Sequence, residues 1–293
     1  MKIHFHKYQA TGNDFVIIDA REENIILSKE NIKFLCHRHF GIGSDGLIIF
    51  ENSDKADFSM QFFNPDGSGG MMCGNGGRSI VKFAADKGVI KDKCTFLAPD
   101  GLHSATIEGE NISLKMTTPT LFQAHKDGFY INTGTSHFVV FENDLNAIDV
   151  IKKGRTLRYD ERFLTYKGCN VNFVEEIKDK NLKIQTYERG VEDLTLACGT
   201  GICAAALTYS VKKGLENANH TINISAQGGN LKVEFEKKEN NTFNNVHLIG
   251  EAKKVFEGEI EMKTFKKIIC TLLIVVMCLT SAPLSEFVGL AQP

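Results

Sequence analysis

The pattern of apolar and polar positions along the chain predicts a mixed α and β protein. Most apolar stretches are short or alternate with polar residues, and Gly, Asn and Asp turns bound them, which is typical of half-buried antiparallel strands. Two longer apolar stretches, Gly77 to Asp86 and Ile202 to Lys212, predict principal helices, because a Lys and a Gly follow each of them. An earlier helix is predicted from Lys29 to His39.

The chain contains an internal duplication. The sequence Cys73-Gly74-Asn75-Gly76-Gly77 opens the first principal helix, and Cys198-Gly199-Thr200-Gly201-Ile202 opens the second. Flanking segments match in the same order: Thr11 to Ile18 with Thr133 to Phe141, Asp57 to Phe63 with Asn181 to Tyr187, and Leu102 to Lys115 with Leu231 to Leu248. We therefore predict an α+β fold of two pseudo-symmetric homologous lobes. Each would be a mostly antiparallel sheet or barrel wrapped around a central helix, with the active site in the cleft between the lobes.

The duplication also predicts the domain boundaries. The first lobe gives way to the second near Thr118-Pro119. Residues 1–118 would form the lobe that carries Cys73, rejoined by about residues 251–262, and residues 119–250 the lobe that carries Cys198.

The last segment, residues 263–293, has a different character. Basic residues precede an uncharged apolar run from Ile268 to Leu279, and small residues follow, which is typical of a secretory signal peptide. We hypothesise that the signal segment of an adjacent reading frame has been fused to the end of a complete enzyme, outside its fold. The alternatives are a terminal helix packed on the body and a membrane tail. The membrane tail is disfavoured, because a spanning helix needs roughly 20 apolar residues.

Composition narrows the functional classes. The net charge of -2 and the pI of about 6.5 give no basic surface, so we expect no nucleic-acid partner. The eight cysteines include no CxxC pair, so we predict no metal site. No export signal precedes the first strand, and we therefore expect a cytoplasmic protein with free thiols. Four of the cysteines are expected to be core residues: Cys36, Cys94, Cys169 and Cys203.

Cys73 and Cys198 suggest acid/base chemistry. A Cys placed just before a Gly-rich turn into a helix lies near unpaired backbone N–H groups, which stabilise a thiolate and can also hold a carboxylate. Inverting the stereocentre of an amino acid requires a base on one face of Cα and an acid on the other. One thiolate and one thiol on pseudo-symmetric lobes supply this pair and require no cofactor, although a Schiff-base lysine stays open.

The sequence closely resembles the diaminopimelate epimerases from Lys2 to about Met262. Seven ordered segments carry the resemblance: Tyr8 to Phe15, Gly41 to Gly46, Phe63 to Ser68, Met72 to Arg78, Asn170 to Phe173, Glu188 to Glu192 and Thr195 to Gly201. This family interconverts LL- and meso-2,6-diaminopimelate on the route to lysine and peptidoglycan precursors. The resemblance implies the same activity, diaminopimelate as the small-molecule substrate, no cofactor and a homodimer.

The resemblance also implies roles for individual residues. Cys73 and Cys198 would be the acid/base pair, and His137 and Glu188 would tune their pKa values, although an isolated His is as often structural. Arg189 suits a bidentate contact with a carboxylate. We assign Asn172 to turn geometry instead. The implied substrate-binding residues are Asn13, Asn64, Gly74, Asn75, Asn170, Glu188, Arg189, Gly199 and Thr200.

Three positions depart from the family pattern. Leu194 stands where an acidic residue is usual, Ser79 where Cys is common, and Thr135-Ser136 where Pro usually precedes the His. Two other readings stay open: a proline racemase-like enzyme, which also uses two Cys, and a binding protein of the same fold that has lost turnover. The phenazine-biosynthesis isomerases share the duplicated architecture, but they typically lack the Cys pair.

Overall fold

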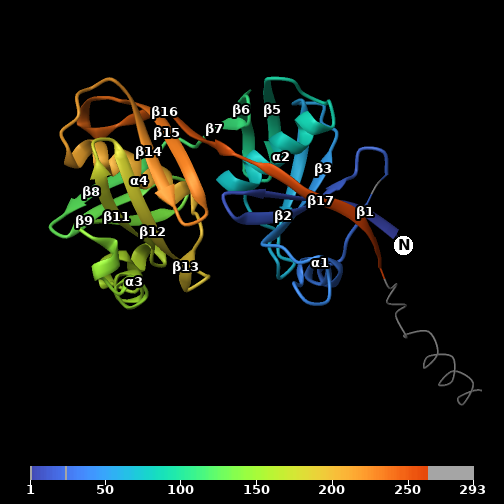
Figure 1. The fold of residues 1–293 in the computed structure, drawn as a ribbon, viewed down its shortest axis with the longest axis horizontal. Helices are drawn as coiled ribbons and strands as arrows, with labels where there is room; N and C mark the ends of the chain where they lie inside the picture. The colour runs from blue at the N-terminus through green and yellow to red at the C-terminus, as the bar shows by residue number, and fades with distance from the viewer. Residues whose placement is uncertain (1, 24, 263–293) are drawn as a thin grey trace, which may run out of the picture. The chain divides into compact units, whose positions relative to one another are not determined.

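A computed structural model of the chain describes residues 2–23 and 25–262 (Figure 1). The signal-like segment predicted at residues 263–293, with its alternatives, lies outside the described residues. Within the described part of the chain, no helix is both long and apolar enough to cross a membrane.

The first half of the chain forms strands around one principal helix, α2 (Figure 1). Its elements are β1 (Lys2–Ala10), β2 (Asn13–Asp19), α1 (Lys29–Cys36), β3 (Gly46–Glu51), β4 (Phe58–Phe63), α2 (Gly74–Asp86), β5 (Lys93–Ala98), β6 (Gly101–Glu108) and β7 (Asn111–Lys115).

The second half repeats this arrangement around α4 (Figure 1). Its elements are β8 (Thr120–His125), β9 (Gly128–Asn132), β10 (Ser136–Glu142), α3 (Val150–Arg158), β11 (Asn170–Lys178), β12 (Asn181–Glu188), β13 (Asp193–Thr195), α4 (Gly199–Lys212), β14 (Asn219–Ala226), β15 (Gly229–Lys237) and β16 (Phe243–Glu251). Three short 3-10 helices complete it: η1 (Leu145–Ala147), η2 (Glu161–Tyr166) and η3 (Glu239–Asn241). The last strand, β17 (Lys253–Glu261), pairs with β1 of the first half instead.

The strand pairings confirm the duplication. In the first lobe, the pair β2–β3 is parallel, β3–β4 antiparallel, β4–β5 parallel, and β5–β6 and β6–β7 antiparallel. In the second lobe, β10–β11, β11–β12, β12–β14, β14–β15 and β15–β16 repeat these directions in the same order. One further antiparallel pair, β16–β7, joins the two lobes into a continuous sheet. The predicted α+β fold of two homologous lobes is therefore confirmed, with parallel pairs at equivalent places in a mainly antiparallel sheet.

The two principal helices lie in the core. Helix α4 packs against strands β9 to β12 and β14 to β16, and every residue from Gly201 to Ser210 is buried. A helix enclosed in this way is apolar on all sides, which matches its sequence. The four cysteines predicted as core residues, Cys36, Cys94, Cys169 and Cys203, are buried, as expected.

The structure corrects the predicted starts of these helices. They begin at Gly74 and Gly199, three residues before the predicted starts, so Cys73 and Cys198 are the N-cap residues. The glycines of the two motifs therefore lie in the first helical turn, and none of them has a positive φ angle. Helix α1 ends at Cys36, three residues earlier than predicted.

Candidate active site

The first turns of α2 and α4 meet. A Cβ atom added to Gly74 would lie 3.6 Å from the Cα of Gly199, and one added to Gly199 would lie 3.4 Å from the Cα of Gly74. Either Cβ would also come within 3 Å of the buried Leu248 side chain. A side chain at either position would therefore displace Leu248, whereas glycine lets the two helix starts lie in van der Waals contact. The structure thus brings the two cysteine-bearing helix ends together, although Cys73 and Cys198 come from different lobes.

The two cysteine side chains have different hydrogen-bond partners. The backbone N–H of Gly76 donates to Cys73 Sγ at 3.2 Å, as a helix N-cap contact. Cys198 makes no such capping hydrogen bond, and its Sγ lies 3.5 Å from the Thr200 hydroxyl. Both sulfurs are next to helix N-termini, where the helix dipole favours a negative charge.

The charged groups around the two thiols differ as well as their hydrogen-bond partners. Burial raises the pKa of Cys73, and the Gly76 N–H and the Arg78 guanidinium oppose that rise. Burial also raises the pKa of Cys198 well above its usual range, and there the Glu188 carboxylate adds to the rise. A nearby positive charge favours a thiolate, whereas a nearby carboxylate disfavours it. Burial therefore disfavours a thiolate at both cysteines, but the cation that counters this effect lies nearer Cys73, so Cys73 is the better candidate for the thiolate and Cys198 for the neutral thiol.

Arg78 is a fully buried cation. Its guanidinium donates to the Gly74 carbonyl oxygen, the Thr11 hydroxyl and the side-chain oxygen of Asn75, at 2.7 to 3.1 Å. Within residues 2–23 and 25–262, no carboxylate forms an ion pair with it. Because a buried charge without a counter-charge is costly, a thiolate at Cys73 offsets the charge of Arg78. Arg78 ends one of the segments that carry the family resemblance, but nothing in the sequence signals that it is buried or gives it a role.

Asn75 links the two lobes. Its side-chain oxygen accepts from Arg78, and its side-chain nitrogen donates to the Ala197 carbonyl oxygen at 3.1 Å and to Asn13 Oδ1 at 3.2 Å. Ala197 directly precedes Cys198. The Asn75 side chain is therefore occupied, and it holds the Cys198 segment beside α2.

Glu188, at the end of β12, lies beside Cys198. Burial raises the pKa of this carboxyl group, and the nearby Thr195 hydroxyl and Cys198 thiol oppose that rise. The role of Glu188 in tuning a thiol stays a prediction.

His137, on β10, is buried in a hydrogen-bonded group that reaches Cys198. Its Nε2 lies 2.9 Å from the hydroxyls of both Thr135 and Thr200, and the Asn172 amide donates to its Nδ1 at 3.0 Å. Asn172 belongs to β11 and does not have a left-handed backbone, so its assignment to turn geometry was wrong. The alternation of Asn170 and Asn172 along a strand, with both side chains on one face, was the signal that could have identified it.

The structure also locates the other predicted substrate-binding residues. Asn13 donates to Asp45 at 2.7 Å, and Asn170 accepts from the backbone N–H of Arg189 at 2.8 Å. The Arg189 guanidinium donates only to the carbonyl oxygens of Tyr166 and Gly168, both at 3.2 Å, so its charge faces no carboxylate among the described residues.

Asn64 differs from the other predicted substrate-binding residues in its hydrogen bonds. It hydrogen-bonds to Ser68 of its own loop at 3.0 Å, and none of its hydrogen bonds within the described part of the chain reaches the residues around the thiols.

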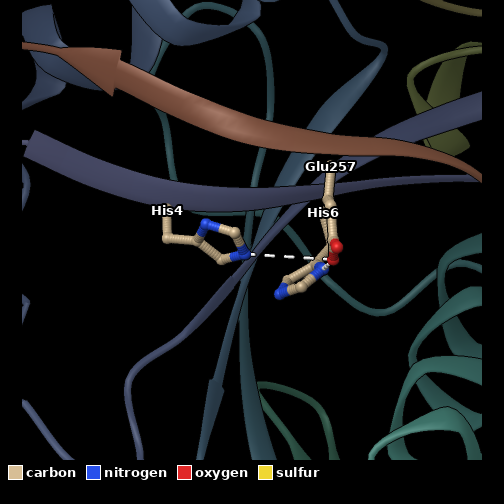
Figure 2. A group of neighbouring side chains, drawn as sticks. All are labelled: His4, His6 and Glu257. Atoms are coloured by element: carbon tan, nitrogen blue, oxygen red, sulfur yellow. Dashed lines mark ion pairs between the residues drawn. The ribbon is translucent and has the colours of Figure 1, made fainter.

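One group outside this site has metal-ligand spacing. His4 and His6 on β1 and Glu257 on β17 place three donor atoms within 4.8 Å of one another (Figure 2). The Glu257 carboxylate also lies 3.0 Å from the Lys254 ammonium group. Burial, together with the charge of Lys87, lowers the pKa of His6 to about 4. These neighbouring cations work against a metal ion, so we assign this group no role in the reaction.

Several known proteins similar in sequence to this chain belong to one family. The sequence model of the family described as diaminopimelate epimerase matches residues 5–122 and 129–255. A diaminopimelate epimerase from Flavobacterium psychrophilum is 46% identical over 259 residues, which cover 87% of this chain and 99% of that protein. One from Aquifex aeolicus is 39% identical over 276 residues, which cover 87% of this chain and 97% of that protein.

Solved structures resemble the fold. A PhzF-family phenazine biosynthesis protein from Bacillus anthracis aligns with a TM-score of 0.72 and 18% identity, covering 89% of this chain and all of that chain. A probable proline racemase from Agrobacterium radiobacter aligns with a TM-score of 0.66 and 13% identity, covering 90% of this chain and 94% of that chain. At these identities the likeness concerns the two-lobed fold alone.

Proposed function

The chain belongs to the diaminopimelate epimerase family, and on this premise we propose that it interconverts LL- and meso-diaminopimelate through a two-base reaction of Cys73 and Cys198. The observation that carries the proposal is the meeting of the two helix starts, each capped by a cysteine. It supplies an acid and a base from opposite lobes, and the reaction needs no cofactor to move the proton.

In the first step, the Cys73 thiolate takes the α-proton from one face of the LL substrate. The Cys198 thiol then gives its proton to the opposite face of Cα, which leaves Cys73 as the thiol and Cys198 as the thiolate. The reverse reaction uses the same groups with exchanged roles. The α-carboxylate would accept hydrogen bonds from the N–H groups at the starts of α2 and α4, through Gly74-Asn75 and Gly199-Thr200. These donors stabilise the charge that develops when the α-proton leaves.

Beyond the α-carboxylate, the substrate would contact Asn13, Asn64, Asn170, Glu188 and Arg189. Arg189 would bind the distal carboxylate, because its guanidinium lacks a carboxylate partner in the described structure. A substrate with a second charged end fits this set better than proline does.

Replacing Arg189 with Met is expected to lower kcat/KM for diaminopimelate roughly 10- to 100-fold, mostly through a higher KM, because a charge-assisted hydrogen bond is lost. Steady-state kinetics over a range of LL-diaminopimelate concentrations measures this. Arg155→Met, an exposed residue on α3, is the matched control and should leave KM unchanged. An unchanged KM in the Arg189 variant would remove this residue from the binding site.

The test of the function is incubation of the reduced protein with LL-diaminopimelate in D2O, without added cofactor. We expect meso-diaminopimelate that carries deuterium at the inverted carbon. Racemisation of proline in a parallel incubation, with diaminopimelate untouched, would keep the chemistry and overturn the substrate. Failure with every amino acid tried would favour a binding protein that has lost turnover.

We also propose, from the family resemblance, that the protein is a cytoplasmic homodimer. Exposed apolar side chains on β17, Val255 and Phe256, support a contact between copies. Light scattering at micromolar concentration would give the mass of a dimer, and a monomer mass would contradict this.

A further inference from the structure

We propose that Asn172 is a positioning residue that fixes the tautomer of His137 and so directs the Thr200 hydroxyl hydrogen toward Cys198. The inference concerns residues that support the reaction, and its catalytic consequence depends on the proposed function. Four side-chain contacts carry it, and they join neighbouring strands to the start of α4.

The first contact orients the Asn172 amide. Thr186 lies opposite Asn172 in the β11–β12 pair, and its hydroxyl donates to Asn172 Oδ1 at 2.9 Å. The amide nitrogen of Asn172 then faces His137 Nδ1 at 3.0 Å. An amide nitrogen can only donate, so Nδ1 must be the unprotonated nitrogen of the ring.

The His137 ring is neutral and carries its hydrogen on Nε2. Burial, with the nearby charge of Arg189, lowers the pKa of His137 to about 3, so the ring is neutral at pH 7. A neutral imidazole carries one hydrogen, and with Nδ1 accepting, that hydrogen is on Nε2. Nε2 is 2.9 Å from both threonine hydroxyls; its one hydrogen lies toward them, and it accepts from neither.

The Thr200 hydroxyl is left with the Cys198 sulfur as its acceptor. Because Nε2 carries a hydrogen, it does not accept the hydrogen of Thr200. The Thr135 hydroxyl cannot donate to Nε2 either. Its oxygen accepts from the Asn170 side chain, and its own hydrogen is directed to Thr200 Oγ1, 3.2 Å away, so Thr200 does not donate to Thr135. The remaining neighbour of the Thr200 hydroxyl is Cys198 Sγ, at 3.5 Å. The network thus aims one hydrogen-bond donor at the sulfur.

This donor matters when Cys198 is a thiolate. Burial and Glu188 both disfavour that charge, and Thr200 is the side-chain hydrogen bond that favours it. The Cys198 thiolate forms after proton transfer to the LL substrate and is the base for the meso substrate. The Asn172 network therefore supports both directions of the reaction.

The test uses Asn172→Asp, which keeps the shape but replaces the donor with an acceptor. We expect the ring hydrogen to move to Nδ1, leaving Nε2 free to accept the Thr200 hydrogen. Nitrogen NMR of ring-labelled histidine in the full chain, assigned with His137→Gln, reports the tautomer without substrate. The pH dependence of Cys198 alkylation, followed by residue-specific mass spectrometry, should move to higher pH in the Asp variant.

Turnover in the Asp variant should fall roughly 10- to 100-fold in both directions. Losses of this size are typical when a residue that orients a reactive group by hydrogen bonding is replaced. Asn223→Asp, an exposed strand residue of the same lobe, is the matched control and should match the wild type in all three measurements. Thr186→Val removes the hydroxyl that orients the amide, and it should produce a mixture of tautomers even if the Asp variant fails to fold.

An unchanged tautomer in both variants would overturn the proposal. So would a changed tautomer with an unchanged alkylation profile. These readouts need no substrate, so they remain decisive if the protein fails to epimerise diaminopimelate.

Discussion

Replacing either Cys73 or Cys198 with Ala is expected to lower the rate of LL-to-meso conversion by at least about 10³-fold. Acid or base catalysis by a positioned group contributes typically 10²- to 10⁴-fold, and a two-base inversion needs both groups at once. Chiral chromatography of the diaminopimelate isomers, together with deuterium incorporation from D2O, measures the loss.

The control for these variants is Cys203→Ala. Cys203 lies on α4 five residues after Cys198, and it is fully buried in the core, where it takes no part in the proposed reaction. We expect it to lower stability modestly through a small cavity and to keep most of the activity. Conversion by Cys198→Ala at more than a few per cent of the wild-type rate would contradict a two-base mechanism.

Replacing Arg78 with Met is expected to produce the second largest effect, a loss of about 10²-fold in turnover. The guanidinium is the cation that favours the Cys73 thiolate. Burial raises the pKa of that thiol, and without Arg78 this rise should be larger. Alkylation of Cys73 by iodoacetamide at neutral pH should be roughly tenfold slower or more, because only the thiolate reacts. Residue-specific mass spectrometry measures both cysteines in the same sample.

The loss of Cys73 alkylation in the Arg78 variant should become smaller as the pH rises. The thiolate population grows as the pH rises through the pKa of the thiol, so the Arg78 variant should recover alkylation rate at higher pH. Cys198 is the internal control, and its profile should change little. Arg78→Lys keeps a charge without the three hydrogen bonds, and it should retain more of the Cys73 reactivity than Arg78→Met. Equal reactivity of Cys73 in the wild type and the Met variant would remove Arg78 from this role.

The two-lobed fold could be predicted because its evidence is local and repeated. Alternation along each strand and the apolar helices report burial of one face or of all sides, and the same order occurs twice in the chain. The strand directions in both lobes then followed the duplication, from the β2–β3 pair with β10–β11 to the β6–β7 pair with β15–β16. The boundary between the lobes near residue 118 stays a prediction, since residues 4–259 form one compact unit by their contacts.

The helix starts were placed too late because the glycines were interpreted as turn residues. In the structure, Gly74 and Gly199 lie in the first helical turns, where a Cβ on either would touch the other helix start and come within 3 Å of the Leu248 side chain. A sequence cannot distinguish these two uses of glycine, because the second depends on a residue from the other half of the chain. The same limit explains Asn172, whose partners His137 and Thr186 belong to the strands on either side of β11.

The sequence by itself determined the duplication and the fold class and pointed to the two cysteines, because periodicity, turn residues and repeated motifs are properties of short segments. Only the tertiary structure decided how the two cysteines differ. Arg78 beside Cys73 and Glu188 beside Cys198 break the symmetry of the lobes, and the bond from Asn75 to Ala197 joins residues 122 positions apart. Burial and electrostatic effects on a thiol depend on distances in space, and these distances exist only once the two lobes have folded against each other.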